Sequence, residues 1–400
     1  MTYGVTTVGA VLKGIVSGKS IRTLERPTQE NEFGILKVSA VTWGEFRPAE
    51  NKAMPLDYDP GECPRAMDGD ILISRANTRE LVGAPVLVHG DHPRLLLSDK
   101  LLKLIPDKTV VDNRYLVRAL RSAGATLHFS QCAGGSSGSM TNITQGDIRS
   151  APLPLPPLPE QRRIAAILDQ ADALRAKRRE ALAQLDSLTQ SIFIEMFGDP
   201  ATNPRQWPVG RIADLLESAS YGTSEKSAAA GEFPVLRMNN LTRSGELDLR
   251  DLKYMELPEG LRSKYLVRAG DVLFNRTNSA ELVGKTAMVP PQAPPLAYAG
   301  YLIRLRVNAE NSPTYLSRFL NTAYAKLMLR GMCKSIIGMA NINATEIQAM
   351  KIALPALALQ QTFATRIQAV EALKTTHRAA LAELDALFAS LQHRAFAGQL

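Results

Sequence analysis

Residues 155–200, LPPLPEQRRIAAILDQADALRAKRREALAQLDSLTQSIFIEMFGDP, and residues 354–398, LPALALQQTFATRIQAVEALKTTHRAALAELDALFASLQHRAFAG, are two versions of one pattern. Each begins with a Pro- and Leu-rich segment that cannot be helical throughout, and then runs on without proline or glycine. Pro159 suits a first helical turn, and Gly198 followed by Pro200 is a stop signal. Each run therefore predicts a helix of roughly 38 residues, about 55–60 Å long at 1.5 Å per residue.

Both runs have heptad spacing, because mostly apolar residues recur alternately every four and three positions. The expected seam is Ile167, Ala171, Leu174, Arg178, Ala181, Leu185, Leu188 and Ile192 in the first run, and Arg366, Val370, Leu373, His377, Ala380, Leu384, Leu387 and Leu391 in the second. A long helix with a narrow apolar stripe needs a partner. We therefore expect the two helices to pair antiparallel through the Ile, Leu and Val members of this seam. Two tandem domains with unrelated helical tails are the alternative.

The repetition extends over the whole chain at an offset of 199 to 201 residues. GDILISRAN at Gly69 returns as GDVLFNRTN at Gly270, YLVRAL at Tyr115 as YLSRFL at Tyr315, and SMTNITQGDI at Ser139 as GMANINATEI at Gly338. One unit of about 200 residues is thus written twice, which excludes a solenoid with its repeats of about 20–50 residues.

Each half mixes short β-rich runs with helical patterns, so we expect an α+β fold. It has two similar α/β domains, residues 1–153 and 200–352, separated by two long antiparallel coiled-coil helices at 154–199 and 353–400, with a pseudo-two-fold internal repeat.

Composition narrows the class of protein. The chain has 400 residues, a mean hydropathy of −0.09 and a net charge of +8. No stretch approaches about 20 apolar residues, so we expect no membrane span. The N-terminal residues lack a basic region ahead of an apolar core, so we expect no secretory signal. Cys63, Cys132 and Cys333 form no CxxC pair, which favours a reducing cytosol and a cytoplasmic location. The positive charge favours a polyanionic partner.

The sequence lacks the motifs of a nucleotide site, a metal site and a methyltransferase active site. KGIVSGKS, from Lys13, falls one residue short of a phosphate-binding P-loop and has Lys where that motif needs Gly. His89 and His92 have no third histidine nearby, so we predict no metal site. No Asn-Pro-Pro-aromatic motif polarises an amine for methylation, since Asn203-Pro204 is followed by Arg205. We therefore predict no catalytic residue in this chain and no cofactor bound by it.

Three pairs of equivalent loops are candidates for contact with nucleic acid. KGIVSGKS, from Lys13, and YGTSEKS, from Tyr221, are rich in Gly, Ser and Lys. They suit a phosphate held by backbone N–H groups and a cation, or are plain surface turns. SRANTRELVG and NRTNSAELVG present Arg, which can grip phosphate or guanine, and Asn, which suits adenine; the alternative is a turn whose Arg pairs with a carboxylate. GGSSGSMTN and CKSIIGMAN allow close backbone approach to a ligand, or are linkers. The candidate residues are Lys19, Ser20, Arg22, Arg75, Asn77, Thr78, Arg79, Ser136, Ser137, Thr223, Ser224, Lys226, Arg276, Thr277, Asn278, Ser279, Lys334 and Ser335.

LPLPPLPEQRRIAAIL, the GDILISR and GDVLFNR strands, and the MTNIT and MANIN segments together resemble the specificity subunit of type I restriction–modification enzymes. The resemblance covers essentially the whole chain and departs only where LALQQTFA replaces LPEQRRIA. It implies two target recognition domains that read a bipartite, asymmetric site on double-stranded DNA. It also implies a helical rod that sets the spacing and docks two methyltransferase subunits for adenine-N6 methylation.

Motor and nuclease subunits for restriction are further implied partners, and S-adenosylmethionine, ATP and Mg²⁺ are expected on the partner subunits. A self-contained two-lobed nuclease with a diverged site, or a coiled-coil scaffold that binds only proteins, remain as alternatives.

Overall fold

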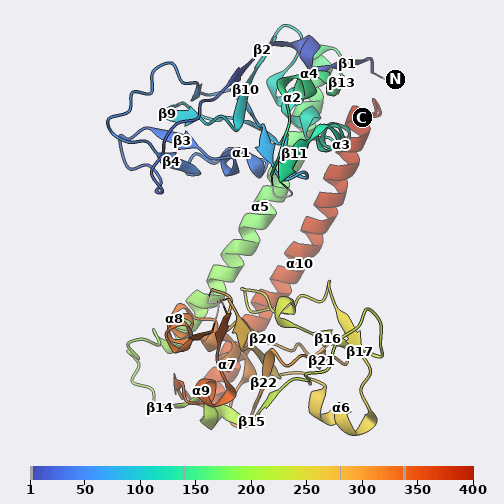
Figure 1. The fold of residues 1–400 in the computed structure, drawn as a ribbon. Helices are drawn as coiled ribbons and strands as arrows, with labels where there is room; N and C mark the ends of the chain where they lie inside the picture. Colours follow the sequence, from blue (N-terminus) through green and yellow to red (C-terminus); the bar gives the residue numbers. More distant parts are fainter. Residues whose placement is uncertain (1–2, 138–139, 280, 337–338) are drawn as a thin grey trace. The chain divides into compact units, whose positions relative to one another are not determined.

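A computed structural model describes residues 3–137, 140–279, 281–336 and 339–400 (Figure 1). The chain forms two compact units. The first unit is Met1–Lys177 with Leu381–Leu400, and the second unit is Arg178–Ala380. Each unit therefore takes part of each long helix. The four-segment division expected above stays a prediction, and the long helices begin at Leu158 and Leu357, a few residues after the expected starts.

The first unit is built mainly from short strands, with short helices between some of them. Its strands are β1 (Val5–Thr7), β2 (Leu12–Ser17), β3 (Gly34–Leu36), β4 (Asn51–Ala53), β5 (Arg65–Ala66), β6 (Ile71–Ser74), β7 (Ala76–Asn77), β8 (Pro85–Leu87), β9 (His92–Leu97), β10 (Leu101–Pro106), β11 (Gly134–Ser137), β12 (Met140–Asn142) and β13 (Pro152–Pro154). Its helices are η1 (Val8–Val11), α1 (Ser39–Thr42), α2 (Asn113–Leu120), α3 (Ala123–Cys132), α4 (Gln145–Ser150) and parts of α5 (Leu158–Phe197) and α10 (Leu357–Phe396).

The second unit repeats this order. Its strands are β14 (Val209–Arg211), β15 (Leu216–Tyr221), β16 (Phe233–Leu236), β17 (Lys253–Met255), β18 (Val272–Asn275), β19 (Thr277–Asn278), β20 (Thr286–Met288), β21 (Ala297–Tyr298), β22 (Leu302–Val307), β23 (Lys334–Ile336), β24 (Met339–Asn341) and β25 (Lys351–Ala353). Its helices are η2 (Ile212–Leu215), η3 (Met238–Asn240), α6 (Glu259–Tyr265), α7 (Pro313–Leu320), α8 (Ala323–Met332), α9 (Ala344–Gln348) and the remaining parts of α5 and α10.

Most strands of the two units correspond, although β5 has no counterpart among the described strands of the second unit. An antiparallel sheet of order β2-β10-β6-β8 in the first unit matches β15-β22-β18-β20 in the second. A small sheet, β11-β12-β7, matches β23-β24-β19, and β4-β3-β9-β5 corresponds to the three strands β17-β16-β21. The mixture of strands and helices, written twice, confirms the predicted α+β internal repeat.

A buried tyrosine on an eight-residue amphipathic helix anchors each core. Tyr115 on α2 donates its hydroxyl to the carbonyl of Pro154 at 2.7 Å, and Tyr315 on α7 donates to the carbonyl of Ala353 at 2.9 Å. Both acceptors end the short strand that precedes a long helix. The burial of each ring is thus compatible with its polar tip, because the hydroxyl finds a partner.

A buried glutamine fixes the start of each long helix. Gln161 accepts the backbone N–H of Asp112 at 2.9 Å and donates to the carbonyls of Val110 and Pro156. Gln360 accepts the N–H of Ser312 at 2.8 Å and donates to the Pro355 carbonyl and to a side chain. These bonds tie the first helical turn to the loop ahead of α2 or α7. They give a physical reason for the glutamine that ends both Leu-Pro-rich motifs.

The long helices pair antiparallel within each unit. In the first unit, Arg175 on α5 bonds Asp385 on α10 at 2.6 Å, and Arg163 donates to the Leu400 carbonyl. In the second unit, Lys374 on α10 lies 2.6 Å from Asp186 on α5, and Arg366 lies 3.1 Å from Glu195. Rising residue numbers on one helix thus meet falling numbers on the other, which confirms the antiparallel arrangement.

The predicted heptad seam is only partly right. Leu174, Leu188, Leu373 and Leu387 are exposed, with relative accessibilities between 43% and 52%. The next residue along the helix takes the seam position in each heptad: Leu168, Arg175, Leu182 and Thr189 on α5, and Ile367, Lys374, Leu381 and Phe388 on α10. A shift of one residue rotates a side chain by about 100° around the helix. The remaining Ile, Leu and Val members are buried or half-buried: Ile167, Leu185, Ile192, Val370, Leu384 and Leu391. Arg366, also placed in the seam, is exposed.

Charged residues can hold the seam because each is paired. In the first unit the cations Arg114, Arg118 and Arg175 meet the carboxylates of Asp169, Asp172 and Asp385. In the second unit the cations Arg318, Lys374 and Arg378 meet Asp186, Glu246 and Glu371. Each network has three charges of each sign, which is the condition for burying charge at low cost.

Candidate nucleic-acid interface

The Arg-bearing segments form the same strand crossing in both units. The backbone N–H of Arg75, between β6 and β7, donates to the Lys100 carbonyl at 2.8 Å, and its carbonyl accepts from Ile143. Arg276, between β18 and β19, donates to the Tyr301 carbonyl at 3.0 Å, and its carbonyl accepts from Ile342. The structure thereby brings SRANTRELVG and NRTNSAELVG against the TNI and ANI segments, which the sequence does not reveal.

The glycine and aspartate of these segments shape the turn before the strand. Gly69 and Gly270 have φ values of +77° and +85°, which favour glycine. Asp70 lies 2.6 Å from the Lys103 amine, and Asp271 forms two 2.8 Å bonds with Arg306. Within the described residues, no carboxylate pairs with the Arg75 or Arg276 side chain, so the alternative in which these arginines serve an ion pair is wrong there.

Several candidate side chains stabilise the loop itself. Asn77 accepts the N–H of Thr78 and donates to the Thr42 hydroxyl, and Asn278 accepts the N–H of Ser279 at 2.9 Å. The Thr277 hydroxyl donates to the Asn341 side chain at 3.3 Å. Arg79 donates to the carbonyls of Ser130 and Ala133 at the C-terminal end of α3. A DNA contact by any of these side chains stays a prediction.

The loops rich in Gly, Ser and Lys do not offer their first N–H groups to a phosphate. Those of Gly18 and Lys19 donate to the carbonyls of Leu101 and Leu97, and those of Gly222 and Thr223 donate to the carbonyls of Leu302 and Tyr298. The expected backbone phosphate cradle is therefore wrong at these positions. Thr223 is also wrong as a surface contact, because it is only 3% exposed and its hydroxyl accepts the N–H of Glu225.

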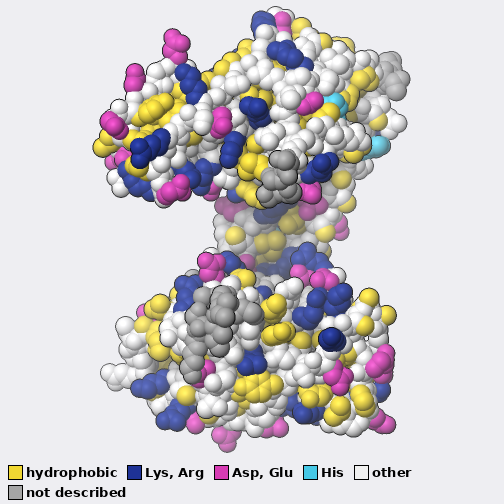
Figure 2. Space-filling model, in the orientation of Figure 1, with side chains coloured by type: hydrophobic (Ala, Val, Ile, Leu, Met, Phe, Trp, Pro, Cys, Tyr) yellow, Lys and Arg dark blue, Asp and Glu magenta, His cyan; other side chains and the backbone are white. Residues whose placement is uncertain are grey.

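The other candidates of these loops are exposed: Lys19, Ser20, Arg22, Ser224 and Lys226. The side chains of Ser136, Ser137, Lys334 and Ser335 lie outside the described part of the structure, although the backbone there forms β11 and β23. Figure 2 shows Lys and Arg over the drawn face of each unit, interspersed with Asp and Glu. On this face, positive charge is thus spread among negative charge in both units.

Aromatic residues beside the Arg-bearing loops escaped sequence reasoning. Tyr221 at the end of β15 and Tyr301 before β22 are both exposed, and the Arg276 guanidinium lies 4.8 Å from the Tyr221 ring centroid. In the first unit the exposed Trp43 follows Thr42, which bonds Asn77. Exposed tyrosine and tryptophan next to arginine are typical of surfaces that bind a planar or anionic partner. In the sequence, these aromatic residues could have been noticed because they lie at the ends of expected strands and helices within the repeat.

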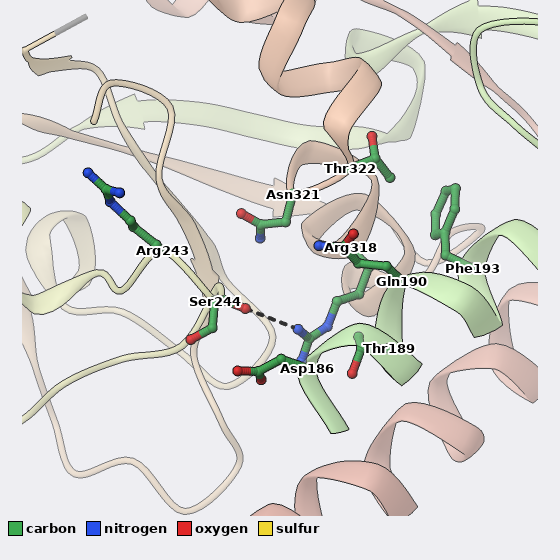
Figure 3. A pocket seen from close by; sticks show the side chains of 9 residues that line it. All are labelled: Asp186, Thr189, Gln190, Phe193, Arg243, Ser244, Arg318, Asn321 and Thr322. Atoms are coloured by element: carbon green, nitrogen blue, oxygen red, sulfur yellow. Dashed lines mark hydrogen bonds between the residues drawn. The ribbon is translucent and has the colours of Figure 1, made fainter. Parts of the chain in front are cut away.

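Hollows in the units differ in size, and include one of about 230 Å³ in the first unit and one of about 370 Å³ in the second. In the second unit, a cavity of about 50 Å³ lies among Asp186, Gln190, Arg243, Ser244 and Arg318 (Figure 3). Arg318 donates there to the Ser244 carbonyl at 3.4 Å and pairs with Glu371, so it stabilises the loop against the helices. This volume is far below the ~300–1,000 Å³ of a cofactor pocket. Among the described residues, no three His, Cys, Asp or Glu side chains gather to hold a metal ion.

In the described chain, the helices are all too short or too polar for a membrane crossing.

The family model described as the type I restriction modification DNA specificity domain matches residues 66–184 and 204–386. The chain is 26% identical over 280 residues to the type I restriction enzyme EcoKI specificity subunit of Escherichia coli K12, which covers 65% of this chain and 60% of that protein. It is 28% identical over 193 residues to the EcoEI specificity subunit of Escherichia coli, 46% of this chain but only 32% of that protein. The chain thus spans about a third to three fifths of these two relatives.

Three matches that cover nearly all of this chain are also to proteins of type I systems. The StySPI specificity subunit of Salmonella potsdam is 22% identical over 425 residues, covering all of this chain and 89% of that protein. A type I restriction–modification S subunit from M. genitalium has a TM-score of 0.57 at 13% identity and covers 99% of this chain and 96% of its own. A chain of a type I system studied for complex assembly has a TM-score of 0.55 at 20% identity, with 100% and 98% coverage. The chain belongs to the family of type I restriction–modification DNA specificity subunits.

Proposed function

We propose that this chain is the non-catalytic DNA specificity subunit of a type I restriction–modification complex. Each unit would read one half of a bipartite, asymmetric site on double-stranded DNA, and the paired helices would set the spacing of the two halves. One observation carries the proposal. The same strand crossing presents an arginine in both units, while the side chains around it differ, as expected for two readers of unlike half-sites.

The long helices supply the docking surface for partners. Leu174 on α5 and Leu373 on α10 occupy equivalent positions in the repeat, as do Leu188 and Leu387, and all four are about half exposed. Exposed leucines retained at equivalent positions indicate contacts made twice. We assign them to two copies of a methyltransferase subunit, which would bring S-adenosylmethionine for adenine-N6 methylation.

Restriction subunits, with ATP and Mg²⁺, would join this assembly for cleavage. The assembly would act in the cytoplasm, where chromosomal and incoming DNA are both accessible.

A methylation assay tests the proposal. Duplex DNA and labelled S-adenosylmethionine are incubated with the full chain, with the methyltransferase subunit of the same system, or with both. We expect methyl transfer to adenine at a defined motif only when both are present. Activity of the chain alone would favour a self-contained enzyme. If the assembled complex did not bind duplex DNA, a protein-binding scaffold would replace the proposal.

A chain carrying Leu188→Ser and Leu387→Ser tests the docking surface in the same assay. Both residues are exposed, so this chain should fold as the wild type does. It should also supply less methyl transfer, because partner docking is weakened.

A further inference from the structure

The two Arg-bearing loops sit in chemically different surroundings. In the second unit the guanidinium of Arg276 lies over the ring of Tyr221, 4.8 Å from its centroid. The Arg276 Nε is buried and has no hydrogen-bond partner among the described residues, and the side chain as a whole is half-buried. Arg75, its equivalent in the first unit, is exposed. The same residue is thus held against a ring in one unit and projects into solvent in the other.

The strand register shows why. Ser17 ends β2 opposite Leu102 on β10, and Tyr221 ends β15 opposite Ile303 on β22. Ser17 and Tyr221 therefore occupy the same place beneath the arginine. Both side-chain oxygens accept a hydrogen bond from the first residue of a short helix. Ser17 accepts from the side chain of Gln145 in α4, and Tyr221 accepts from the N–H of Ala344 in α9. Tyr221 is anchored at its hydroxyl, which fixes the ring under Arg276.

Two more pairs of equivalent residues around Arg75 and Arg276 differ between the units. The residue whose carbonyl accepts the arginine N–H is Lys100 in the first unit and Tyr301 in the second. The residue after the glycine forms an isolated β-bridge in both units. It is Lys19, bridged to Ser98, in the first unit and the buried Thr223, bridged to Ala299, in the second. The first loop therefore gathers three exposed cations, Arg75 with Lys19 and Lys100. The second gathers one arginine and two exposed tyrosines.

These surroundings suit different contacts with DNA. A phosphate needs positive charge and little orientation, so several mobile cations serve it well. A base edge needs a planar guanidinium held in one orientation, because discrimination comes from two hydrogen bonds made together. Stacking on Tyr221 removes part of the rotamer freedom that Arg276 would otherwise lose on binding.

We propose that Arg276, stacked on Tyr221, reads a base of the half-site bound by the second unit. The equivalent Arg75, with Lys19 and Lys100, grips phosphates of the other half-site. The proposal rests on the proposed function and adds that Arg276 and Tyr221 determine specificity, whereas Arg75 contributes affinity.

The test substitutes lysine for each arginine, because lysine keeps the charge and loses the planar fork. The wild-type complex with methyltransferase subunits first selects its target from a random-sequence duplex pool. Binding is then measured on that duplex and on single-base variants. We expect Arg75→Lys to stay within about two-fold of the wild type. We expect Arg276→Lys to lose about 10- to 100-fold of discrimination at one base pair, the range of a bidentate arginine contact.

Two further pairs of variants separate reading from mere stability. Tyr221→Leu removes the ring and should relax the same base pair as Arg276→Lys, whereas Tyr221→Phe keeps the ring and should retain discrimination. Arg75→Gln should lower the slope of log affinity against log salt by about 0.9, the value for one phosphate contact, without changing the selected sequence.

An unchanged selected sequence with both Arg276→Lys and Tyr221→Leu would overturn this inference while leaving the proposed function intact. A wild-type complex that selects no sequence would contradict the proposed function, and this inference with it.

Discussion

Lys374 is a buried cation whose removal should destabilise the second unit. Its side chain is 1% exposed on α10, with its amine 2.6 Å from Asp186, 2.5 Å from Glu246 and 3.1 Å from Glu371. Lys374→Ala leaves these carboxylates without their shared cation, and breaking a buried ion pair from one side costs about 3–5 kcal/mol. Asp186 keeps water contact and Glu246 keeps Arg378, so we place the loss at about 3 kcal/mol, near the lower bound.

The chain supplies its own probe for this measurement. It has two tryptophans, and Trp207 lies in the second unit, where its indole N–H donates to the Phe197 carbonyl at 3.0 Å. In a Trp43→Phe background, Trp207 fluorescence during urea unfolding therefore reports on the second unit. The matched control is Arg366→Ala, which removes an exposed pair with Glu195 on the same two helices and should cost less than about 1 kcal/mol. Equal losses for the two variants would refute the reasoning.

The same network gives a pH dependence. Burial alone would raise the pKa of Glu246, but hydrogen bonds from Arg378 and Lys374 outweigh it and hold the pKa below the ordinary 4.5. A lowered folded-state pKa stabilises the fold above pH 4.5, and the contribution is lost as pH falls through the folded value. The difference in unfolding free energy between wild type and Glu246→Gln should shrink as the solution is acidified. A difference that grew would show that the carboxylate is not stabilised as described.

Three other changes have outcomes that the structure specifies. Gln161→Leu should cost the first unit about 2 kcal/mol, because the half-buried Asp112 N–H and the Val110 and Pro156 carbonyls lose their partner. Trp43 fluorescence during urea unfolding in a Trp207→Phe background measures the loss, and a neutral change would contradict that role. Gly222→Ala should lower the melting temperature, because a Cβ would lie 2.3 Å from the Ala299 carbonyl oxygen, and unchanged melting would mean that the strand crossing is loose. Leu188→Ser with Leu387→Ser should leave melting unchanged but weaken methyltransferase binding in calorimetry by about tenfold; full binding would move the docking surface elsewhere.

The repeat could be predicted because a constant offset relates whole segments, so equivalent residues such as Tyr115 and Tyr315 needed no structure to be paired. The helix seam could only be half predicted. Counting heptads favours leucine over charge and therefore places Leu174 in the seam. Its neighbour takes the seam position because Asp172 and Asp385, one nearby and one 210 residues away, neutralise it. Heptad periodicity in the sequence does not reveal such charge partners.

The candidate DNA-facing residues were limited in the same way. Arg75 and Arg276 stood out because they are retained in both copies, and both lie at the strand crossing. Tyr221 did not stand out, because its importance depends on ending β15 beneath Arg276. Thr223 was wrongly chosen because a Gly-Ser-Lys composition suggests an open loop, whereas the backbone continues into the sheet and buries it.

Sequencing of modified adenines in cellular DNA tests the central claim most directly. Cells that carry this chain with its methyltransferase subunit should show N6-methyladenine at one asymmetric motif of two halves with a gap of constant length. Exchange of residues 200–352 for those of another specificity subunit should change one half and leave the other. A single contiguous motif, or methylation that persists unchanged without this chain, would contradict the account.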